Sequence, residues 1–208
     1  MSTQLVLGTP AAAYPMRQAA FPAGVDPTTC KRVRLVFAYL SYSGLRALLK
    51  APGSQEPGIE NVKTEWIVGL SHGITEPRAL KAILALPNAT LWLFSPDGAL
   101  SRRSLQVPPL MHGKIVAIEP DGDGRLLGLV AGSANLTGAA VGITPRNFEA
   151  GLTLTNGETP LNDDRPAFDG WWDTLKGKCL QGHRSAHRHL CKQPPGIPCH
   201  TPKSNRPD

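Results

Sequence analysis

The sequence predicts an α/β domain in which helices flank a mixed β-sheet. Short apolar runs typical of strands alternate along the chain with runs whose apolar residues repeat at helical spacing. The hydrophobic content of 41% is enough for a core, and the charged content of 18% is low for a disordered chain. All apolar runs stay well short of the roughly 18 residues that a membrane-spanning helix needs, so no membrane partner is expected.

The expected elements follow in chain order. Strands are predicted at residues 33–38, 62–70, 89–96, 114–118, 125–132 and 148–155, because each is an apolar run bounded by turn residues. Helices are predicted at residues 44–50, within 71–86 with a start at residues 74–77, and at 166–178, with a short helix or loop at 134–147. Thr75 is expected to cap the second helix, with Pro77 in its first turn. Trp171 and Trp172 are expected to pack in the core or at its edge.

Composition divides the chain into three segments. Residues 1–30 are predicted to be an irregular leader, because prolines interrupt their apolar stretch and they lack the basic start of a secretory signal. Residues 31–178 are predicted to form the globular domain, and residues 179–208 a basic tail rich in Cys, His and Pro. Without a secretory signal, we expect a cytoplasmic protein with reduced thiols.

The net charge of +6 is concentrated at the C-terminal end. Between Lys176 and Asp208, seven basic residues stand against one acidic residue, whereas residues 1–175 hold 15 of each sign. A basic tail beside a neutral body fits an anchor on the phosphate backbone of nucleic acid, because Lys and Arg contacts release counterions. It fits a solvated end that keeps the protein soluble equally well.

Two polar clusters flank the strands predicted at 114–118 and 125–132. His112 and Lys114 are two residues apart and therefore lie on one face of an extended chain, and the same rule places Ser133 and Asn135 together. Paired strands would bring an imidazole, an ammonium, a hydroxyl and an amide around one small space. This set suits a tetrahedral anion: Lys neutralises charge, Ser and Asn donate hydrogen bonds, and His attacks or transfers a proton. Glu149, at the start of the next strand, is placed to hold the second imidazole nitrogen.

Each of these residues alone has a simpler interpretation. A single His is more often structural than catalytic, a Lys at a strand start is usually solvated, and "GSAN" fits a turn. The order and spacing of the whole set favour a site.

The pattern "HGK", then "GSANLTG", then "NFEAG" resembles the phospholipase D superfamily, whose signature is His-x-Lys, four residues, Asp, and then Gly-Ser-x-Asn. The resemblance covers residues 33–178, and the strand–helix–strand lead-in is similar to single-motif, restriction-endonuclease-like members. The sequence departs from the signature at Glu119, where the superfamily has Asp.

The resemblance implies a role for each residue. His112 would be the nucleophile that forms a phosphohistidine. Lys114 and Asn135 would bind phosphate oxygens with help from Ser133, and Glu149 would orient the histidine. The resemblance implies no metal ion or other cofactor.

The superfamily site uses two His-Lys motifs, and this sequence has one. His72 is followed by Gly and Ile, so it is not a second copy and is interpreted as a loop residue at a strand end. We therefore expect a homodimer whose active site lies on the two-fold axis, with one His112 from each chain.

The tail has two interpretations. Its spacing of potential zinc ligands matches no signature with two close Cys pairs, so a disordered or partly helical tail is favoured over a structural zinc site. The ligands of such a zinc site would be Cys179, His183, His187, Cys191 and Cys199. The tail is too short for a recognition domain, so sequence-specific cleavage would need a partner protein for recognition.

The leading hypothesis is a metal-independent phosphodiesterase that cleaves DNA or RNA. One alternative is a phospholipase D-type lipid phosphodiesterase or transferase, which would share the site. Another is a non-catalytic nucleic-acid-binding protein of the same fold.

Overall fold

The computed structural model describes residues 2–9, 30–49, 59, 62–96, 110–120, 126, 128–141, 146–155 and 165–182. The strands are β1 (Ser2–Gly8), β2 (Cys30–Phe37), β3 (Thr64–Val68), β4 (Ala89–Phe94), β5 (Lys114–Pro120), β6 (Gly128–Gly132), β7 (Glu149–Thr155) and β8 (Cys179–Gln181). The helices are α2 (Tyr42–Leu49), α3 (Pro77–Ala85), α4 (Gly138–Val141) and α6 (Arg165–Lys176), with a 3₁₀ helix at Ser71–Gly73.

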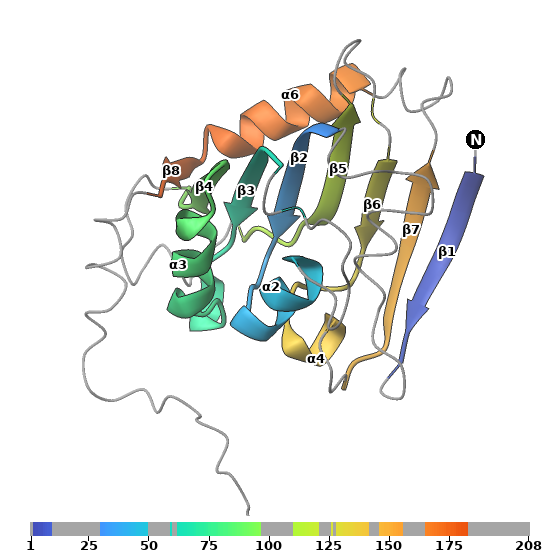
Figure 1. The fold of residues 1–208 in the computed structure, drawn as a ribbon, viewed down its shortest axis with the longest axis horizontal. Helices are drawn as coiled ribbons and strands as arrows, with labels where there is room; N and C mark the ends of the chain where they lie inside the picture. The colour runs from blue at the N-terminus through green and yellow to red at the C-terminus, as the bar shows by residue number, and fades with distance from the viewer. Residues whose placement is uncertain are drawn as a thin grey trace, which may run out of the picture.

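Within these residues the strands form one eight-stranded sheet in the order β1-β7-β6-β5-β2-β3-β4-β8 (Figure 1). The pairs β2–β3 and β3–β4 are parallel, and the other pairs are antiparallel. Helix α3 lies in the connection between the parallel strands β3 and β4, as a parallel pair requires. The mixed sheet with flanking helices confirms the predicted fold class.

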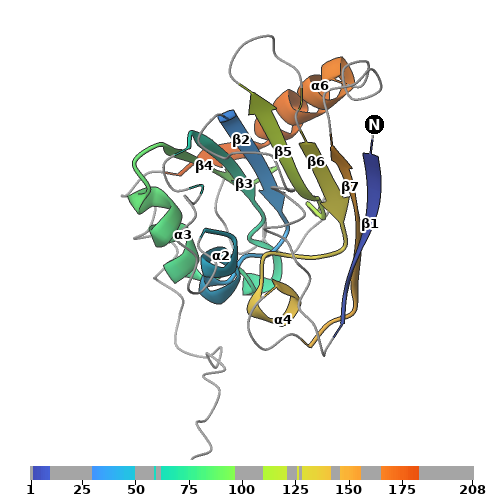
Figure 2. The ribbon, with the colours of Figure 1, turned by 45° about the vertical axis from the view of Figure 1, so that its right-hand side comes forward.

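Helices cover both faces of the sheet, as the turned view shows (Figure 2). Along β2, Val33, Leu35 and Phe37 point to the face covered by α2, α3 and α4. Arg34 and Val36 point to the other face, where α6 packs. The alternation follows from the pleat of a strand, and it explains why β2 reads as a nearly continuous apolar run.

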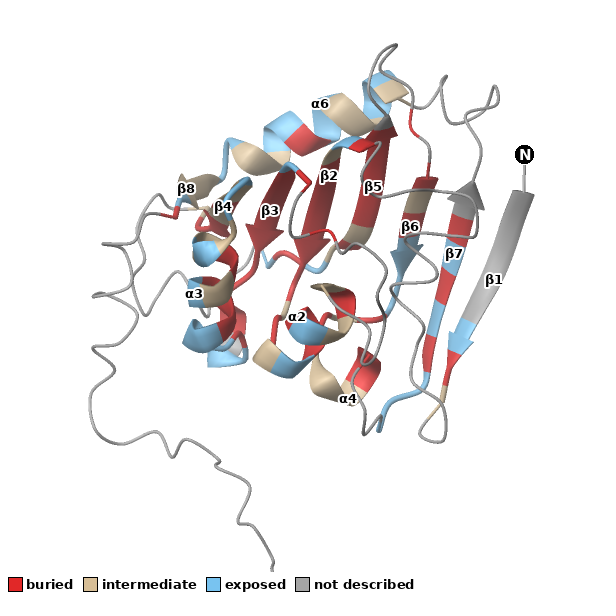
Figure 3. Ribbon diagram, in the orientation of Figure 1, coloured by how far each residue is buried: buried red, intermediate tan, exposed pale blue. Residues whose placement is uncertain are grey.

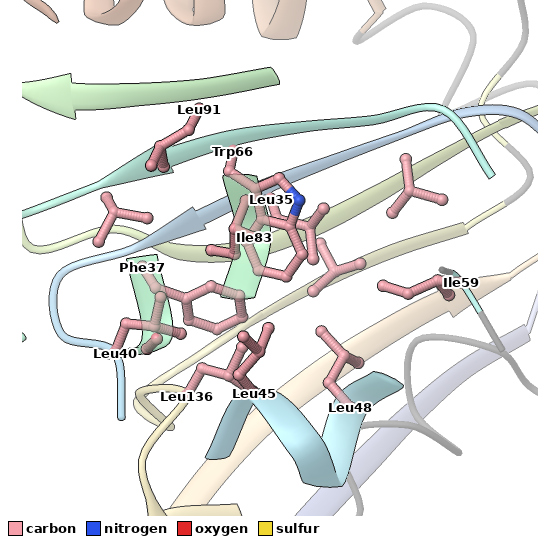
Figure 4. Packing of buried hydrophobic residues seen from close by; sticks show 14 of the residues in the cluster. Leu35, Phe37, Leu40, Leu45, Leu48, Ile59, Trp66, Ile83, Leu91 and Leu136 are labelled. Carbon is pink, nitrogen blue, oxygen red and sulfur yellow. The ribbon is translucent and has the colours of Figure 1, made fainter. Parts of the chain in front are cut away.

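The core lies over the middle of the sheet (Figure 3), where β2 and β3 are buried on both faces. Trp66 on β3 packs among leucines and isoleucines from α2, α3 and neighbouring strands (Figure 4). On the opposite face, Trp172 of α6 is buried in the smaller cluster, which confirms the expected packing role. Trp171 is 40% exposed and lies at the edge of this cluster, next to Phe168.

Both ends of the predicted domain need correction. Ser2–Gly8 was expected within an irregular leader, but it forms strand β1 and pairs along its whole length with β7. Cys179–Gln181 was assigned to the tail, but it forms β8 against β4. Edge strands draw their order from backbone hydrogen bonds to a partner that is distant in the sequence, so their own composition gives a weak signal.

Helix α3 starts where the sequence predicts, at residues 74–77, but its cap differs from the prediction. The helix begins at Pro77, in agreement with the expected place of this proline, but no side chain caps it. The Thr75 hydroxyl instead donates to the Gly69 carbonyl at 2.6 Å and accepts from the Leu40 amide at 3.3 Å. Thr75 therefore ties the ends of β2 and β3 together, and the predicted capping role is wrong.

In the part of the chain that the structure describes, no helix is both long and apolar enough to cross a membrane.

Candidate active site

All the predicted site residues except Glu119 come together where β5 and β7 begin and β6 ends, at the lower end of the sheet in Figure 1. Strand β5 begins there with Lys114, which pairs with Phe37 at the end of β2. Strand β6 runs antiparallel to both β5 and β7, so it ends where these two strands begin. Its last residue, Gly132, pairs with Gly151, two residues beyond Glu149. The order and directions of the strands therefore bring His112 and Glu149, 37 positions apart in the sequence, to the same end of the sheet.

Lys114 is the buried cation of the site. Its side chain lies on the face covered by α2, α3 and α4, because Lys114 pairs with Phe37. Its Nζ donates to the His112 carbonyl oxygen at 2.8 Å. Burial lowers the pKa of Lys114 from its ordinary value of 10.5, and the negative charge of Glu149 opposes this effect only in part. An ammonium has three donors, so donors remain for an anion.

Asn135 is held so that its amide can donate. Its Oδ1 accepts from the Tyr39 backbone amide at 3.0 Å, which leaves the NH₂ group for another acceptor. The adjoining backbone is fixed as well, because the Ser41 amide donates to the Leu136 carbonyl at 2.9 Å. Gly44 of α2 lies so close to Leu136 that an added Cβ would meet its carbonyl oxygen. The loop after β6 is therefore clamped between the end of β2 and helix α2.

Glu149 is buried at the start of β7 and uses both carboxylate oxygens. One accepts from the Ser133 hydroxyl at 2.5 Å, and the other from the Asn147 side-chain amide at 3.0 Å. The Ser133 hydroxyl in turn accepts from the Ala150 amide at 3.0 Å. The Ser133 hydroxyl was expected to assist phosphate binding, but in this structure it donates its hydrogen to Glu149.

His112 lies just before β5 and is exposed. Its backbone is anchored, because Lys114 binds its carbonyl oxygen and the next carbonyl, that of Gly113, accepts from the Ala38 amide at 3.0 Å. Its imidazole has no hydrogen-bond partner among the described residues, so the expected bond to Glu149 is not made in this structure. The ring is open to a ligand from outside.

Glu119, at the acidic position of the motif, lies at the other end of β5. It lies five positions after Lys114, a distance of about 17 Å along a strand. It is buried and contacts Arg32 at 2.7 Å, Arg165 at 3.3 Å, and Arg34. Glu119 therefore belongs to an ion cluster under α6 and not to the candidate site.

The ion cluster also includes Glu65 and Asp169. Asp169 binds Arg34 at 2.5 Å and Arg165 at 2.7 Å, and Arg32 reaches Glu65 at 3.3 Å. Burial alone would raise the pKa of Asp169, but the two arginines lower it. The Arg34 guanidinium also lies over the Phe168 ring, 4.6 Å from its centre. The cluster joins β2, β3 and β5 to helix α6.

Sequence reasoning missed two contributors to the site. The Tyr39 amide is a backbone group, and no sequence pattern marks its contact with Asn135. Asn147 stands two residues before Glu149 in "NFEAG", and this spacing is the only available sign of its role.

The described ranges contain no group of three His, Cys, Asp or Glu residues that could hold a metal ion. Of the predicted zinc ligands, only Cys179 lies within these ranges. Its thiol donates to the Leu175 carbonyl oxygen at 3.2 Å, and burial raises its pKa to about 12, which disfavours the thiolate that zinc binds. His183, His187, Cys191 and Cys199 lie outside the described residues, so the zinc site stays the less favoured interpretation of the tail.

Comparisons with known proteins agree on the fold. No protein-family model and no curated protein matches the chain. Among solved structures, it is similar to Nuc from Salmonella typhimurium, a phospholipase D family member, with a TM-score of 0.56 and 16% identity over 88% of this chain and 98% of that chain. It is also similar to NucT from Helicobacter pylori, with a TM-score of 0.53 and 14% identity over 87% and 100% of the two chains. At these identities the likeness establishes a phospholipase D-like fold.

Proposed function

We propose that this protein is a metal-independent phosphodiesterase that cleaves nucleic acid through a phosphohistidine intermediate on His112. The arrangement at the end of β5 carries the proposal. A buried ammonium (Lys114), an amide held as a donor (Asn135) and an exposed imidazole (His112) meet there in a phospholipase D-like fold. Together they provide binding groups and a nucleophile for a phosphodiester.

The proposed reaction has two steps. An imidazole nitrogen of His112 attacks phosphorus, the bond from phosphorus to the leaving oxygen breaks, and a second imidazolium protonates that oxygen. Water then attacks the phosphohistidine and gives its proton to the second imidazole, while the N–P bond breaks and its electron pair returns to His112. Lys114 and Asn135 bind the nonbridging oxygens, where negative charge accumulates. Glu149 positions the site through Ser133 and balances the charge of Lys114.

The second imidazole is proposed to be His112 of another copy in a homodimer. One observation supports this: the His112 ring is exposed and engages no described residue, so a second chain can approach it. His72 is the other histidine in the described part of the chain. It lies in the 3₁₀ helix Ser71–Gly73 and lacks the lysine two positions later.

Nucleic acid is proposed over lipid because of charge. The net charge of +6 between Lys176 and Asp208 suits a polyanion, whose backbone offers many phosphates to bind. A sequence-specific activity would use a recognition partner.

The test is an incubation of the purified full chain in EDTA with labelled single- and double-stranded DNA, RNA, and vesicles of phosphatidylcholine. We expect nucleic acid to be cleaved, the cleavage to be lost in His112→Ala, and the cleavage to persist in His72→Ala, the matched control. Turnover of lipid alone would favour the phospholipase alternative. Tight binding of nucleic acid without cleavage would favour the non-catalytic alternative.

A further inference from the structure

Helix α6 covers only part of the sheet face on which it packs, which is the face opposite to Lys114. One row of paired residues crosses this face: Val36 of β2, Ile115 of β5, Ala131 of β6 and Leu152 of β7. Val36 is buried under α6, and Ile115 is half-buried. Ala131 is exposed, and Leu152 is 49% exposed. Along this row, the cover that α6 provides therefore ends between β5 and β6.

Strand β7 has an inverted pattern of burial. Its buried positions are Glu149, Gly151 and Thr153, whereas Ala150 and Leu152 between them are exposed (Figure 3). A sheet with one face in water normally turns its apolar side chains to the core and its polar ones to the solvent. From the sequence alone, the alternating apolar residues of β7 would be assigned to the core, and only the register of the strands places them outside. The inversion indicates that another surface covers this face.

The exposed side chains on this side of the sheet form one apolar surface. Leu7 of β1 pairs with Ala150 and is 60% exposed, and Phe148 directly precedes β7 and is 80% exposed. We call this surface the bare face, and its residues are Leu7, Ala131, Phe148, Ala150 and Leu152. None of these side chains carries a charge, so the bare face offers nothing to the phosphates of a nucleic acid.

The outer side of α6 is a second uncharged surface on the same side of the sheet. Phe168, Trp172 and Leu175 of this helix face the sheet. The outer side consists of exposed residues at helical spacing: Ala167, Gly170, Trp171 and Thr174. A glycine within a helix is destabilising, and a Cβ at Gly170 would meet no atom of the described residues within 4 Å. Packing within the chain therefore gives no reason for Gly170, whereas the close approach of another surface does.

We propose that the bare face and the outer side of α6 form an isologous interface between two copies of this chain. Helix α6 of each copy lies over the bare face of the other copy. A two-fold axis that runs parallel to the strands, above β5 and β6, produces this arrangement, because it exchanges the covered and the bare halves of the face. The proposal deepens the proposed function and rests on it for the choice of a second copy as the occupant.

The interface extends to the candidate site. The Cη2 atom of Trp171 lies 3.8 Å from the position that a Cβ on Gly113 would take, and Gly113 directly follows His112. An axis parallel to the strands keeps the same ends of the two sheets together. Both copies of β5 therefore begin at one end of the dimer, next to the axis, and bring both copies of His112 to that end.

The size of the two surfaces fits a contact between copies. The bare face lies on β1, β7 and β6, which together span about 14 Å across the sheet and about 20 Å along it. Helix α6 has 12 residues, so its outer side is about 18 Å long and about 10 Å wide. Each copy would contribute roughly 500 Å² and the whole contact about 1,000 Å², the size at which specific interfaces begin.

The basic tail is a poorer occupant of the bare face. Gly182, the last described residue, donates its amide to the Leu91 carbonyl of β4 at 2.7 Å. The tail therefore begins at the edge of the sheet opposite to β1 and β7. It is rich in Lys, Arg and His, whose charges an apolar surface does not compensate.

The test places a charge on each surface of the full-length protein and measures its molar mass by light scattering over a dilution series. Wild-type protein should have twice the mass of one chain. Leu152→Glu on the bare face and Gly170→Arg on α6 should each raise the dimer Kd by about 10²- to 10³-fold, because each change occurs twice in a dimer. Ile74→Glu, at a position 48% exposed and outside both surfaces, is the matched control and should keep the wild-type mass.

A mixture of the two variants tests which surface meets which. In the mixed dimer, one contact is wild type and the other sets the new Glu side of one copy against the new Arg side of the other. An equimolar mixture should therefore associate more tightly than either variant alone. Gly170→Arg is expected to fold at least as well as the wild type, since Arg favours a helix more than Gly does, and thermal unfolding checks this.

Three results would overturn the interface: a wild-type chain that stays monomeric, an unchanged Kd in both variants, or a mixture that gains no affinity. A segment of the same chain that covered the bare face would give the first of these results. Failure of the enzymatic proposal is separate. If the chain dimerises through these surfaces but cleaves nothing in EDTA, the interface stands and the nuclease does not. If cleavage depends on His112 while both variants keep their mass and activity, the nuclease stands and the interface does not.

Discussion

Lys114 sets the electrostatics of the candidate site, because it is a cation buried beside a carboxylate. Only the charged form neutralises a phosphate, so activity depends on its protonation. We predict that kcat/KM falls at alkaline pH with an apparent pKa below 10.5, since burial lowers the pKa of this group. Glu149→Gln should move this fall to still lower pH, because the carboxylate that raises the Lys114 pKa is removed. A pH profile of kcat/KM for both proteins measures this. If kcat/KM fell at the same alkaline pH in Glu149→Gln as in the wild type, the assignment of this fall to Lys114 would be contradicted.

Asn135 provides a second residue-level prediction. Asn135→Asp keeps an oxygen for the Tyr39 amide but replaces the NH₂ donor with a negatively charged acceptor. We expect kcat to fall by about 10²- to 10³-fold, as for the loss of a donor to a transition-state oxygen, with little change in Tm. Steady-state kinetics and thermal unfolding of the variant measure the two effects. Near-normal turnover would show that Asn135 does not face the phosphate.

At this scale the sequence predicted which residues lie together at this end of the sheet, but not the groups that hold them. His112, Lys114, Ser133, Asn135 and Glu149 were predictable because order and spacing along paired strands place them at one end of the sheet. The contacts that orient them were not. Asn135 and the Tyr39 amide are 96 positions apart, and no local pattern links a side chain to a distant backbone group.

At the scale of elements, β5 connects two different environments. Its first residue serves the candidate site, and Glu119 near its other end balances three arginines under α6. A sequence motif that contains both residues does not make them one site, because a strand extends about 3.4 Å per residue.

This separation predicts distinct effects for Glu119→Ala. The buried arginines would lose their counter-charge, so we expect the free energy of unfolding to fall by about 3–5 kcal/mol. The activity of the chains that remain folded should be unchanged. Chemical denaturation and active-site-normalised kinetics separate the two quantities. Glu65→Ala removes a carboxylate whose ion pair within the described residues is with Arg32, and it should cost less. If Glu119→Ala lost activity without losing stability, Glu119 would belong to the candidate site and the separation argued here would be wrong.

Most elements followed from local pattern, and the exceptions have a common cause. The central strands and the helices that cover them carry clear apolar periodicity, because they are buried on one or both faces. Strands β1 and β8 lie at the two edges of the sheet and depend on partners far away in the sequence. The sequence pattern predicts Thr75 as a cap, but its hydroxyl binds the Gly69 carbonyl and the Leu40 amide instead.

At the scale of the whole molecule, the proposal requires two chains for one reaction. Wild-type and His112→Ala chains mixed in equal amounts and allowed to exchange should retain roughly a quarter of the undiluted activity, because only wild-type pairs hold both histidines. Chains that act alone would retain half. An activity assay after co-refolding, with the molar mass from light scattering, distinguishes the two outcomes. Mixing with His72→Ala chains should cause no loss.

The fold class was the most predictable property of the molecule, since it needs only the alternation of strand and helix patterns. The way in which two chains would assemble was harder to predict. The sequence contains one His-Lys motif, but no pattern in it indicates the surface that a second chain would cover.

The most direct test of the account is the chemical identity of the reaction intermediate. The full chain is mixed in EDTA with a single-stranded oligonucleotide and quenched in alkali, in which a phosphorus–nitrogen bond to histidine survives. The peptides are then analysed by mass spectrometry. We predict a nucleotide adduct on His112 that is absent from His112→Ala, which should also fail to cleave. An adduct on another residue, or cleavage by His112→Ala at the wild-type rate, would contradict the account.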